Sequence, residues 1–454
     1  MVSATAPARG GREGVPPARM RRRLVDLSTT PGRLRLLLAG LVLISLAWGA
    51  LAAFTASQYS AAAADVVTVR EPLSLDALQI YQRLSDANDA ATTAFLIGGL
   101  EPAAVQQRYL ADLTAAETGL EDAVARGGAG HGATADDLST LATDISLYDG
   151  EVQTAVADNR LGMPLGAAYL REASGLMRGR LLPKAKDLYA AENASLHGTS
   201  GHATGEPLID AAGAAGLAIA VAFCLALRWL GRRTNRVLNL GLLAAGAAVV
   251  VSLGWMAAAY AVARGDLLDA QARGSATVEA LAQVGIAVQE AHADESLTLI
   301  DNAGDKVKRV GDETYQADYT KKKSALGPGP GTLLTDAETA ARGTPAASAV
   351  AATVRDAGSW FAAHAAVRVL DDNDKHGTAV NSVLSAAPGT AGAAFARLSA
   401  DIAAATKLDQ AVFDSTARSA SGAYTGMEYG LSAGALIMAV GCAWGISRRL
   451  GEYR

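Results

Sequence analysis

Four long stretches without a charged residue constrain this chain more than any other feature of its sequence. Each is rich in Leu, Val, Ala and Gly, and they run over 36–57, 211–227, 237–263 and 429–447. A helix needs about 20 apolar residues to cross the hydrocarbon core of a bilayer. The sequence therefore predicts an all-α membrane protein with four transmembrane helices. We place these helices at 34–57, 207–228, 237–263 and 428–447.

The distribution of charge predicts how these helices are oriented. Segments 1–35, 228–236 and 447–454 together hold 15 basic and 3 acidic residues, whereas the rest of the chain holds 25 basic and 42 acidic residues. Arg in short segments beside apolar spans is retained on the cytoplasmic side. We therefore expect a multi-pass protein of the cell membrane with both termini in the cytoplasm. An Arg-rich loop at 229–236 and a tail at 448–454 would also be cytoplasmic.

The N-terminal region allows two interpretations of the first apolar stretch. The run Arg21 to Arg23 resembles the start of a signal peptide, but the apolar core that follows is much longer than the usual 7 to 15 residues, which favours an uncleaved anchor. Residues 1–33 combine Pro, Gly and Arg, which is typical of a disordered basic tail on anionic membrane lipid. This tail has no aromatic residue for base stacking, so we expect no nucleic-acid partner.

The two remaining blocks, 58–206 and 264–427, are predicted to be extracytoplasmic helical-bundle domains. In the first block, small and apolar residues recur in steps of three and four, as in Ala77, Ile80, Leu84 and Ala87. A chain that leaves the membrane and returns to it needs an even number of helices, and the pattern predicts a four-helix bundle over 58–206.

The second block is helical but less regular. A Gly-Pro loop at 327–331 interrupts it beside Lys321 to Lys323, which we interpret as a solvated face or, alternatively, an anion contact. A further helix is predicted from about Ser385 or Ala391 to Gly426. The Ser-Leu-Ala-Trp sequence at 45–48 matches Ser-Leu-Gly-Trp at 252–255, which favours an internal duplication.

The residues that usually perform catalysis are not arranged for it. Both cysteines, Cys224 and Cys442, fall inside predicted spans, and the six histidines show no metal-binding spacing. The acidic run from Asp371 to Gly377 faintly resembles a calcium loop, but Val383 stands where a bidentate Glu is needed, so we interpret the run as a solvated turn. We therefore predict a protein that is not an enzyme and that uses no metal and no cofactor.

The predicted cytoplasmic segments are too short to fold into an output domain, and this limits how the protein could signal. If the protein signals, it must present short basic segments to another protein. The spans carry no ionisable residue near their middle, which argues against a coupled transporter. They are instead dense in Gly, which permits close helix packing either within one chain or in a homodimer.

Several local sequences resemble the actinobacterial GlnX family of membrane proteins. They are the segments 94–102, 158–160 with 164–174, 293–300 and 447–454. The resemblance covers the whole architecture, and the outer blocks also resemble the four-helix-bundle input domains of chemoreceptors. It implies a transmembrane adaptor for amino-acid sensing, in which a solute-binding lipoprotein of the GlnH type docks outside and a cytosolic Ser/Thr kinase of the PknG type receives the signal. At the end of the 293–300 segment, Asp301 and Asn302 stand where the family tends to have a basic residue.

Two sets of residues are candidate partner contacts. The outer set lies at the predicted junction of the third and fourth helices and comprises Asn159, Arg160, Tyr169, Arg171 and Glu172. The inner set comprises Arg232, Arg233, Arg448 and Arg449. Turn capping and salt bridges within the bundle would also explain the first set, and topology alone would explain the second.

Two alternative functions stay open at this point. The chain could be a structural membrane subunit of a transport or envelope complex, or a receptor that binds a small ligand directly in one bundle.

Overall fold

The computed structural model describes residues 30–98, 103–127, 132–204, 207–234, 239–269, 276–302 and 314–451. Within these ranges the chain is overwhelmingly helical and forms no strand, which confirms the all-α prediction. The chain divides into two compact units. We call residues 1–51, 214–252 and 431–454 the span unit, and residues 52–213 and 253–430 the bundle unit. Residues 1–29 of the predicted basic tail (1–33) and residues 452–454 lie outside the described ranges, whereas residues 30–33 belong to a helix that begins at Thr30.

Four helices carry the apolar stretches. They are α1 (Thr30–Asp65), α7 (Pro207–Thr234), α8 (Leu240–Asp269) and α15 (Met427–Gly451). Each includes a window long and apolar enough to cross a membrane, which confirms the four predicted apolar helices. All four continue without a break from one unit into the other, because the unit boundaries fall inside them.

Glycines bring α8 and α15 together within the span unit. A Cβ atom on Gly241 would lie 2.5 Å from the carbonyl oxygen of Gly441, so the two backbones approach more closely than any other residue would allow. The side-chain nitrogen of Asn239 donates a hydrogen bond of 2.9 Å to the carbonyl oxygen of Gly445. These small residues therefore serve packing within one chain, and the homodimer stays a prediction.

The first half of the bundle unit consists of long antiparallel helices. They are α2 (Glu71–Ile97), α3 (Ala103–Gly127), α4 (Gly132–Arg160) and a last helical stretch made of α5 (Leu165–Leu176), the π-helical turn η3 (Met177–Leu181) and α6 (Leu182–Thr204). A second π-helical turn, η1 (Val66–Arg70), joins α1 to α2. The predicted stripe of Ala77, Ile80, Leu84 and Ala87 is buried. Gly98, with φ of +68°, ends α2, as is common for a glycine.

The second half contains six helices in the described residues. They are α9 (Ala276–Asn302), α10 (Thr314–Leu326), α11 (Leu333–Ala340), α12 (Ala347–Asp372), α13 (His376–Leu384) and α14 (Ala391–Gly422). The predicted glycine-rich loop separates α10 from α11, and the predicted last helix ends at Gly422.

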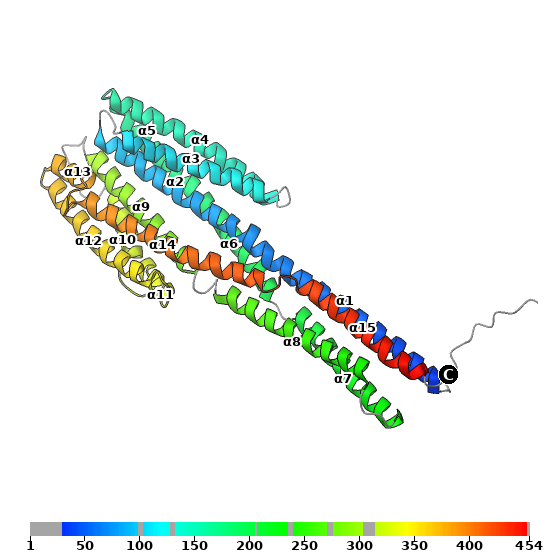
Figure 1. Ribbon diagram of the computed structural model, residues 1–454. Coiled ribbons are helices and arrows are strands. Elements are labelled where there is room, and N and C mark those ends of the chain that lie inside the picture. The colour runs from blue at the N-terminus through cyan, green and yellow to red at the C-terminus, as the bar shows by residue number, and fades with distance from the viewer. Residues whose placement is uncertain are drawn as a thin grey trace, which may run out of the picture. The chain divides into compact units, whose positions relative to one another are not determined.

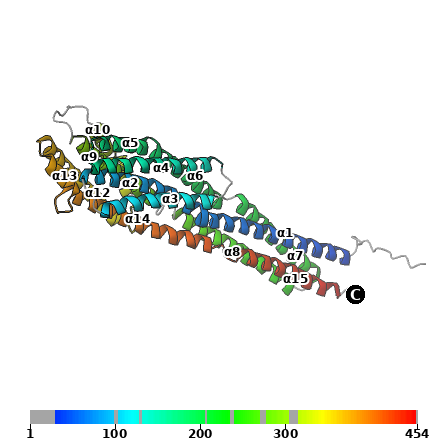
Figure 2. The same ribbon diagram turned by 90° about the horizontal axis from the view of Figure 1, so that it is seen from above.

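Helix α9 packs against both halves of the bundle unit. It lies along α2 on one side and contacts α10, α11 and α14 on the other (Figure 1 and Figure 2). Val278 and Ala282 of α9 belong to the same apolar core as the stripes of α2 and α3. The two halves therefore share a core along α2 and α9, each 27 residues long, while the duplication predicted from 45–48 and 252–255 stays a prediction.

Candidate functional site

The most unusual feature of the bundle unit is a stretch of α9 that is buried on every side. All ten residues from Ala291 to Ile300 are buried, and three of them, His292, Asp294 and Glu295, are ionisable with exposed fractions of 4%, 0% and 1%. Burying a charge costs several kcal/mol unless a partner compensates it. Because consecutive helix positions point in different directions, the three side chains meet three different sets of neighbours.

His292 faces α2. Its Nδ1 atom is hydrogen-bonded to a carboxylate oxygen of Asp89, and its ring stacks on Phe395 of α14 with a centroid distance of 3.7 Å. Asp89 also accepts a hydrogen bond of 3.3 Å from Arg108 of α3. Burial lowers the pKa of His292, but the charge and hydrogen bond of Asp89 outweigh burial and leave that pKa raised. The His292–Asp89 pair, through its contacts with Arg108 and Phe395, therefore connects α2, α3, α9 and α14.

Asp294 faces a different pair of elements. It accepts a hydrogen bond of 2.8 Å from Arg178 and one of 2.5 Å from Lys322 of α10. Arg178 lies in the π-helical turn η3, and such turns often occur at functional sites. Burial raises the pKa of Asp294, with Lys322 and Arg178 opposing it. The expectation of a solvated lysine run is wrong for Lys322, whose side chain is only 18% exposed.

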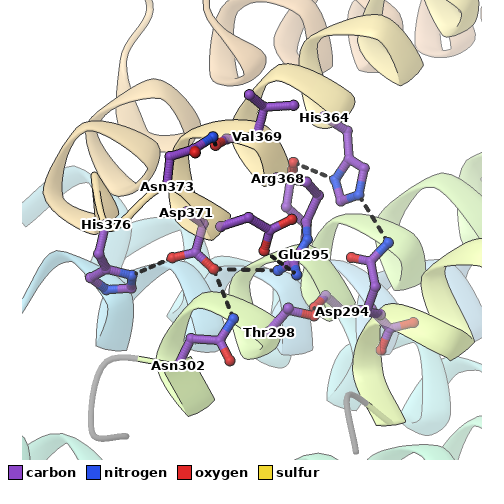
Figure 3. Close-up of polar contacts among 12 residues, drawn as sticks. Asp294, Glu295, Thr298, Asn302, His364, Arg368, Val369, Asp371, Asn373 and His376 are labelled. Atoms are coloured by element: carbon purple, nitrogen blue, oxygen red, sulfur yellow. Dashed lines mark hydrogen bonds and ion pairs between the residues drawn. The ribbon is translucent and has the colours of Figure 1, made fainter. Parts of the chain in front are cut away.

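Glu295 faces α12. It accepts a hydrogen bond of 2.7 Å from Nδ1 of His364 (Figure 3). The His364 ring also stacks on Tyr319 of α10, with a centroid distance of 3.6 Å. We call His292, Asp294 and Glu295 with their partners Asp89, Arg178, Lys322 and His364 the α9 polar junction. It contacts α2 and η3 from the first half of the bundle unit and α10 and α12 from the second.

Asp371 connects α12 to the end of α9 and to α13. Its carboxylate accepts hydrogen bonds of 2.8 Å from His376 of α13 and from Asn302 at the end of α9, and one of 3.4 Å from Arg368 (Figure 3). The solvated-turn interpretation is therefore wrong for Asp371, which is buried. Among the residues that the structure describes, no cluster of His, Cys, Asp or Glu could hold a metal ion.

The predicted outer contact residues do not form one cluster. Asn159 donates a hydrogen bond of 3.0 Å to the carbonyl oxygen of Phe95 at the end of α2, so it connects α4 to α2. Tyr169 packs against a small apolar group that includes Leu297 and Ile300 of α9. Arg171 is exposed and forms an ion pair of 3.0 Å with Asp301, also of α9. Three of the five predicted residues thus contact α2 or α9.

The other predicted contacts are surface residues. Arg160 and Glu172 are exposed in the bundle unit. In the span unit Arg232 is exposed, and the Arg448 guanidinium lies 5.0 Å from the Trp444 ring centre. The side chains of Arg233 and Arg449 lie outside the described residues. As partner contacts, these residues stay predictions.

Sequence reasoning missed the α9 polar junction. The segment 293–300 drew attention only through a family resemblance, and His292 and Asp89 did not stand out. One signal was available, because three ionisable residues within four positions of a helix cannot all share one face. Which partners neutralise them depends on packing between residues more than 100 positions apart, such as Arg178 and Asp294.

Residues 62–200 match the family model described as the actinobacterial sensor domain. No curated protein and no solved structure matches the chain. The matched region runs from the end of α1 to α6 and includes Asp89, Arg178 and the predicted outer contacts. It supports a sensing role for a chain with four apolar helices.

Proposed function

We propose that this protein is a transmembrane sensor or adaptor without enzymatic activity of its own. In this proposal the bundle unit lies outside the cytoplasm and receives an amino-acid signal from a solute-binding lipoprotein, as the GlnX resemblance implies. The basic ends of the four apolar helices pass the signal to a cytosolic Ser/Thr kinase. The observation that carries the proposal is the sensor-domain match over 62–200 in a chain with four membrane-length helices.

The proposed route from outside to inside runs along the chain itself. Four helices continue from the bundle unit into the span unit, and α1 reaches α2 through the π-helical turn η1. Packed helices shift between discrete arrangements more readily than they deform continuously. A partner that changes how α2 packs on α9 would therefore act directly on α1, with the α9 polar junction as the part that distinguishes the arrangements.

The proposed outer docking surface surrounds the turn between α4 and α5. Arg160, Arg171 and Glu172 are exposed there, while Asn159 and Tyr169 connect the turn to α2 and α9. The proposed inner contacts are Arg232, Arg233, Arg448 and Arg449, together with anionic lipid.

Site-specific photo-crosslinking in living cells tests this proposal. A photoreactive residue at Glu172 should capture a solute-binding lipoprotein, and one at Arg232 or Arg448 should capture a Ser/Thr kinase. Glu117 of α3 is the matched control, because it is also an exposed glutamate on a helix of the bundle unit. Equal capture at Glu117 and Glu172 would argue against a docking surface at the turn.

The same experiment separates the sensor from a structural role. Capture of a transport ATPase or of cell-wall machinery at these positions, with no binding lipoprotein and no kinase, would replace the sensor proposal with that of a structural membrane subunit.

A further inference from the structure

Two clefts of the bundle unit border the contact between α2 and α9. The first lies between α2, α9 and α14 and has a volume of about 380 Å³, and we call it the α14 cleft. The second lies between α2, α6 and α9, with a volume of about 510 Å³, and we call it the α6 cleft. Both volumes are within the range of small-molecule sites. Volume alone therefore does not show which cleft is the better candidate for a ligand site, and the residues that line each cleft must be compared.

Buried polar atoms without partners occur in only one of the two linings. Within the described residues, Oε1 of Gln289 and Oγ of Ser399 are inaccessible to solvent and have no hydrogen-bond partner, and both residues line the α14 cleft. No residue that lines the α6 cleft has such an atom. A buried polar atom without a hydrogen-bond partner destabilises the folded protein. A polar molecule in the α14 cleft would satisfy these atoms once the two side chains turned towards it.

The α14 cleft also carries charges of both signs. Asp86 of α2 and Lys407 of α14 line it, and neither has an ion pair with another described residue. Arg83 lines it too, although one of its nitrogens already donates to Asp112 at 2.8 Å. Burial, and after it the nearby carboxylate of Asp112, raises the pKa of Asp86 to about 7, against the opposing charges of Arg108 and Arg83.

The remaining lining selects for a compact, polar molecule. Gln79, Gln82, Gln289 and Gln410 supply amide donors and acceptors from three helices, and Ile286 and Ile402 supply apolar contact. A ligand with only one sign of charge would leave either Asp86 or Lys407 without a partner. A ligand without charge would leave both.

We propose that the α14 cleft binds a small zwitterion of the amino-acid class. Its ammonium group would pair with Asp86 and its carboxylate with Lys407 and Arg83, while Gln289 and Ser399 would turn towards the cleft to bond its other polar groups. Because α2 and α14 come from different halves of the bundle unit, such a ligand would strengthen the contact between the halves. This binding goes beyond docking of a lipoprotein and does not depend on it.

Binding to the full-length protein in lipid nanodiscs tests the proposal. Each of the twenty free amino acids is added in turn as the probe. The shift in Tm is measured by thermal unfolding, and binding is measured by calorimetric titration. We expect at least one of them to raise Tm by several degrees at millimolar concentration. The corresponding amine without the carboxylate, and the corresponding acid without the ammonium group, should each bind at least about tenfold more weakly.

Matched variants locate the site. Gln289→Leu and Gln283→Leu change the same residue type on α9, but Gln289 lines the α14 cleft and Gln283 lines the α6 cleft. We expect Gln289→Leu and Asp86→Asn to weaken binding about tenfold or more, and Gln283→Leu to leave it unchanged. Lys407→Gln alters an exposed side chain and should weaken binding without affecting the helical circular dichroism.

Two outcomes would overturn the proposal. One is the absence of any Tm shift or heat for all twenty amino acids with a folded wild-type protein. The other is a loss of binding in Gln283→Leu but not in Gln289→Leu, which would place the ligand in the α6 cleft. Capture of a lipoprotein at Glu172 would be unaffected by either outcome, so the two proposals fail separately.

Discussion

Helix α8 of the span unit and helix α9 of the bundle unit are both closely packed, but by different means. On α8, Gly241 lets the backbone approach Gly441 and Gly445 of α15 so closely that one added carbon atom would collide. On α9, His292, Asp294 and Glu295 are buried and each is held by a partner of opposite charge or by a hydrogen bond. The first contact depends on shape and the second on compensation of charge, so they should respond to different perturbations.

The largest effect is expected from removing the charge at the centre of the α9 polar junction. Asp294→Ala would leave Arg178 and Lys322 without their shared carboxylate in a mostly buried setting. Breaking one partner of a buried ion pair costs about 3–5 kcal/mol. We expect a loss of that size in the free energy of unfolding, measured by denaturation of the full-length protein in nanodiscs. A loss below about 1 kcal/mol would contradict the assignment of Asp294 as the centre of the junction.

A smaller effect is expected from pH, through the buried carboxylate of Glu71. Glu71 is buried at the start of α2, and burial, followed by a hydrogen bond and repulsion from Asp414, raises its pKa from 4.5 to about 8. The folded state therefore holds a proton that the unfolded state releases. The stabilisation is complete below about pH 4.5 and is lost as the pH rises towards 8.

Glu71→Gln isolates this contribution. Each pH unit within that window changes the stability by at most about 1.4 kcal/mol per group. Between pH 5.5 and 7.5 we therefore expect the wild-type protein to lose about 2–3 kcal/mol relative to Glu71→Gln, measured by unfolding of both proteins at each pH. Because Asp86 titrates in the same direction, only the difference between the two proteins is informative. Parallel curves for the two proteins would contradict a shifted pKa at Glu71.

The close contact between α8 and α15 in the span unit can be tested by adding a single methyl group. Gly241→Ala adds a single carbon that would lie 2.5 Å from the Gly441 carbonyl oxygen. A Cβ added at Gly246, on the same helix, would have no described atom within 4 Å apart from its chain neighbours and the backbone of its own helix. Overpacking typically costs about 1–3 kcal/mol. We expect that loss of unfolding free energy for Gly241→Ala and no loss for Gly246→Ala. Equal effects would mean that helix propensity, and not contact with α15, decides the outcome.

The two helices also differ in how far the sequence predicts them. Uncharged stretches with Gly241 and Gly441 predict apolar, closely packed helices, because a bilayer-length helix needs little beyond composition. The stripe around Ile80 and Leu84 likewise predicts α2. The pairs His292 with Asp89 and Arg178 with Asp294 could not be predicted, because each joins residues from different halves of the chain. The π-helical turn η3, which carries Arg178, has no sequence signature that we recognised.

The smallest effect on stability is expected at the predicted docking surface. Arg171 and Asp301 form an ion pair of 3.0 Å, but their side chains are 42% and 48% exposed, so water and salt screen it. Such a pair contributes about 0.2–1 kcal/mol, and Arg171→Ala should change Tm by only a degree or two. If the turn between α4 and α5 docks a lipoprotein, the same substitution should reduce photo-capture at Glu172 several-fold, whereas Arg397→Ala, which removes an exposed arginine from α14, should not. Arg171 would then be a recognition residue, because its effect on capture would far exceed its effect on folding. A large loss of stability without a change in capture would instead make the ion pair a structural tie between α5 and α9.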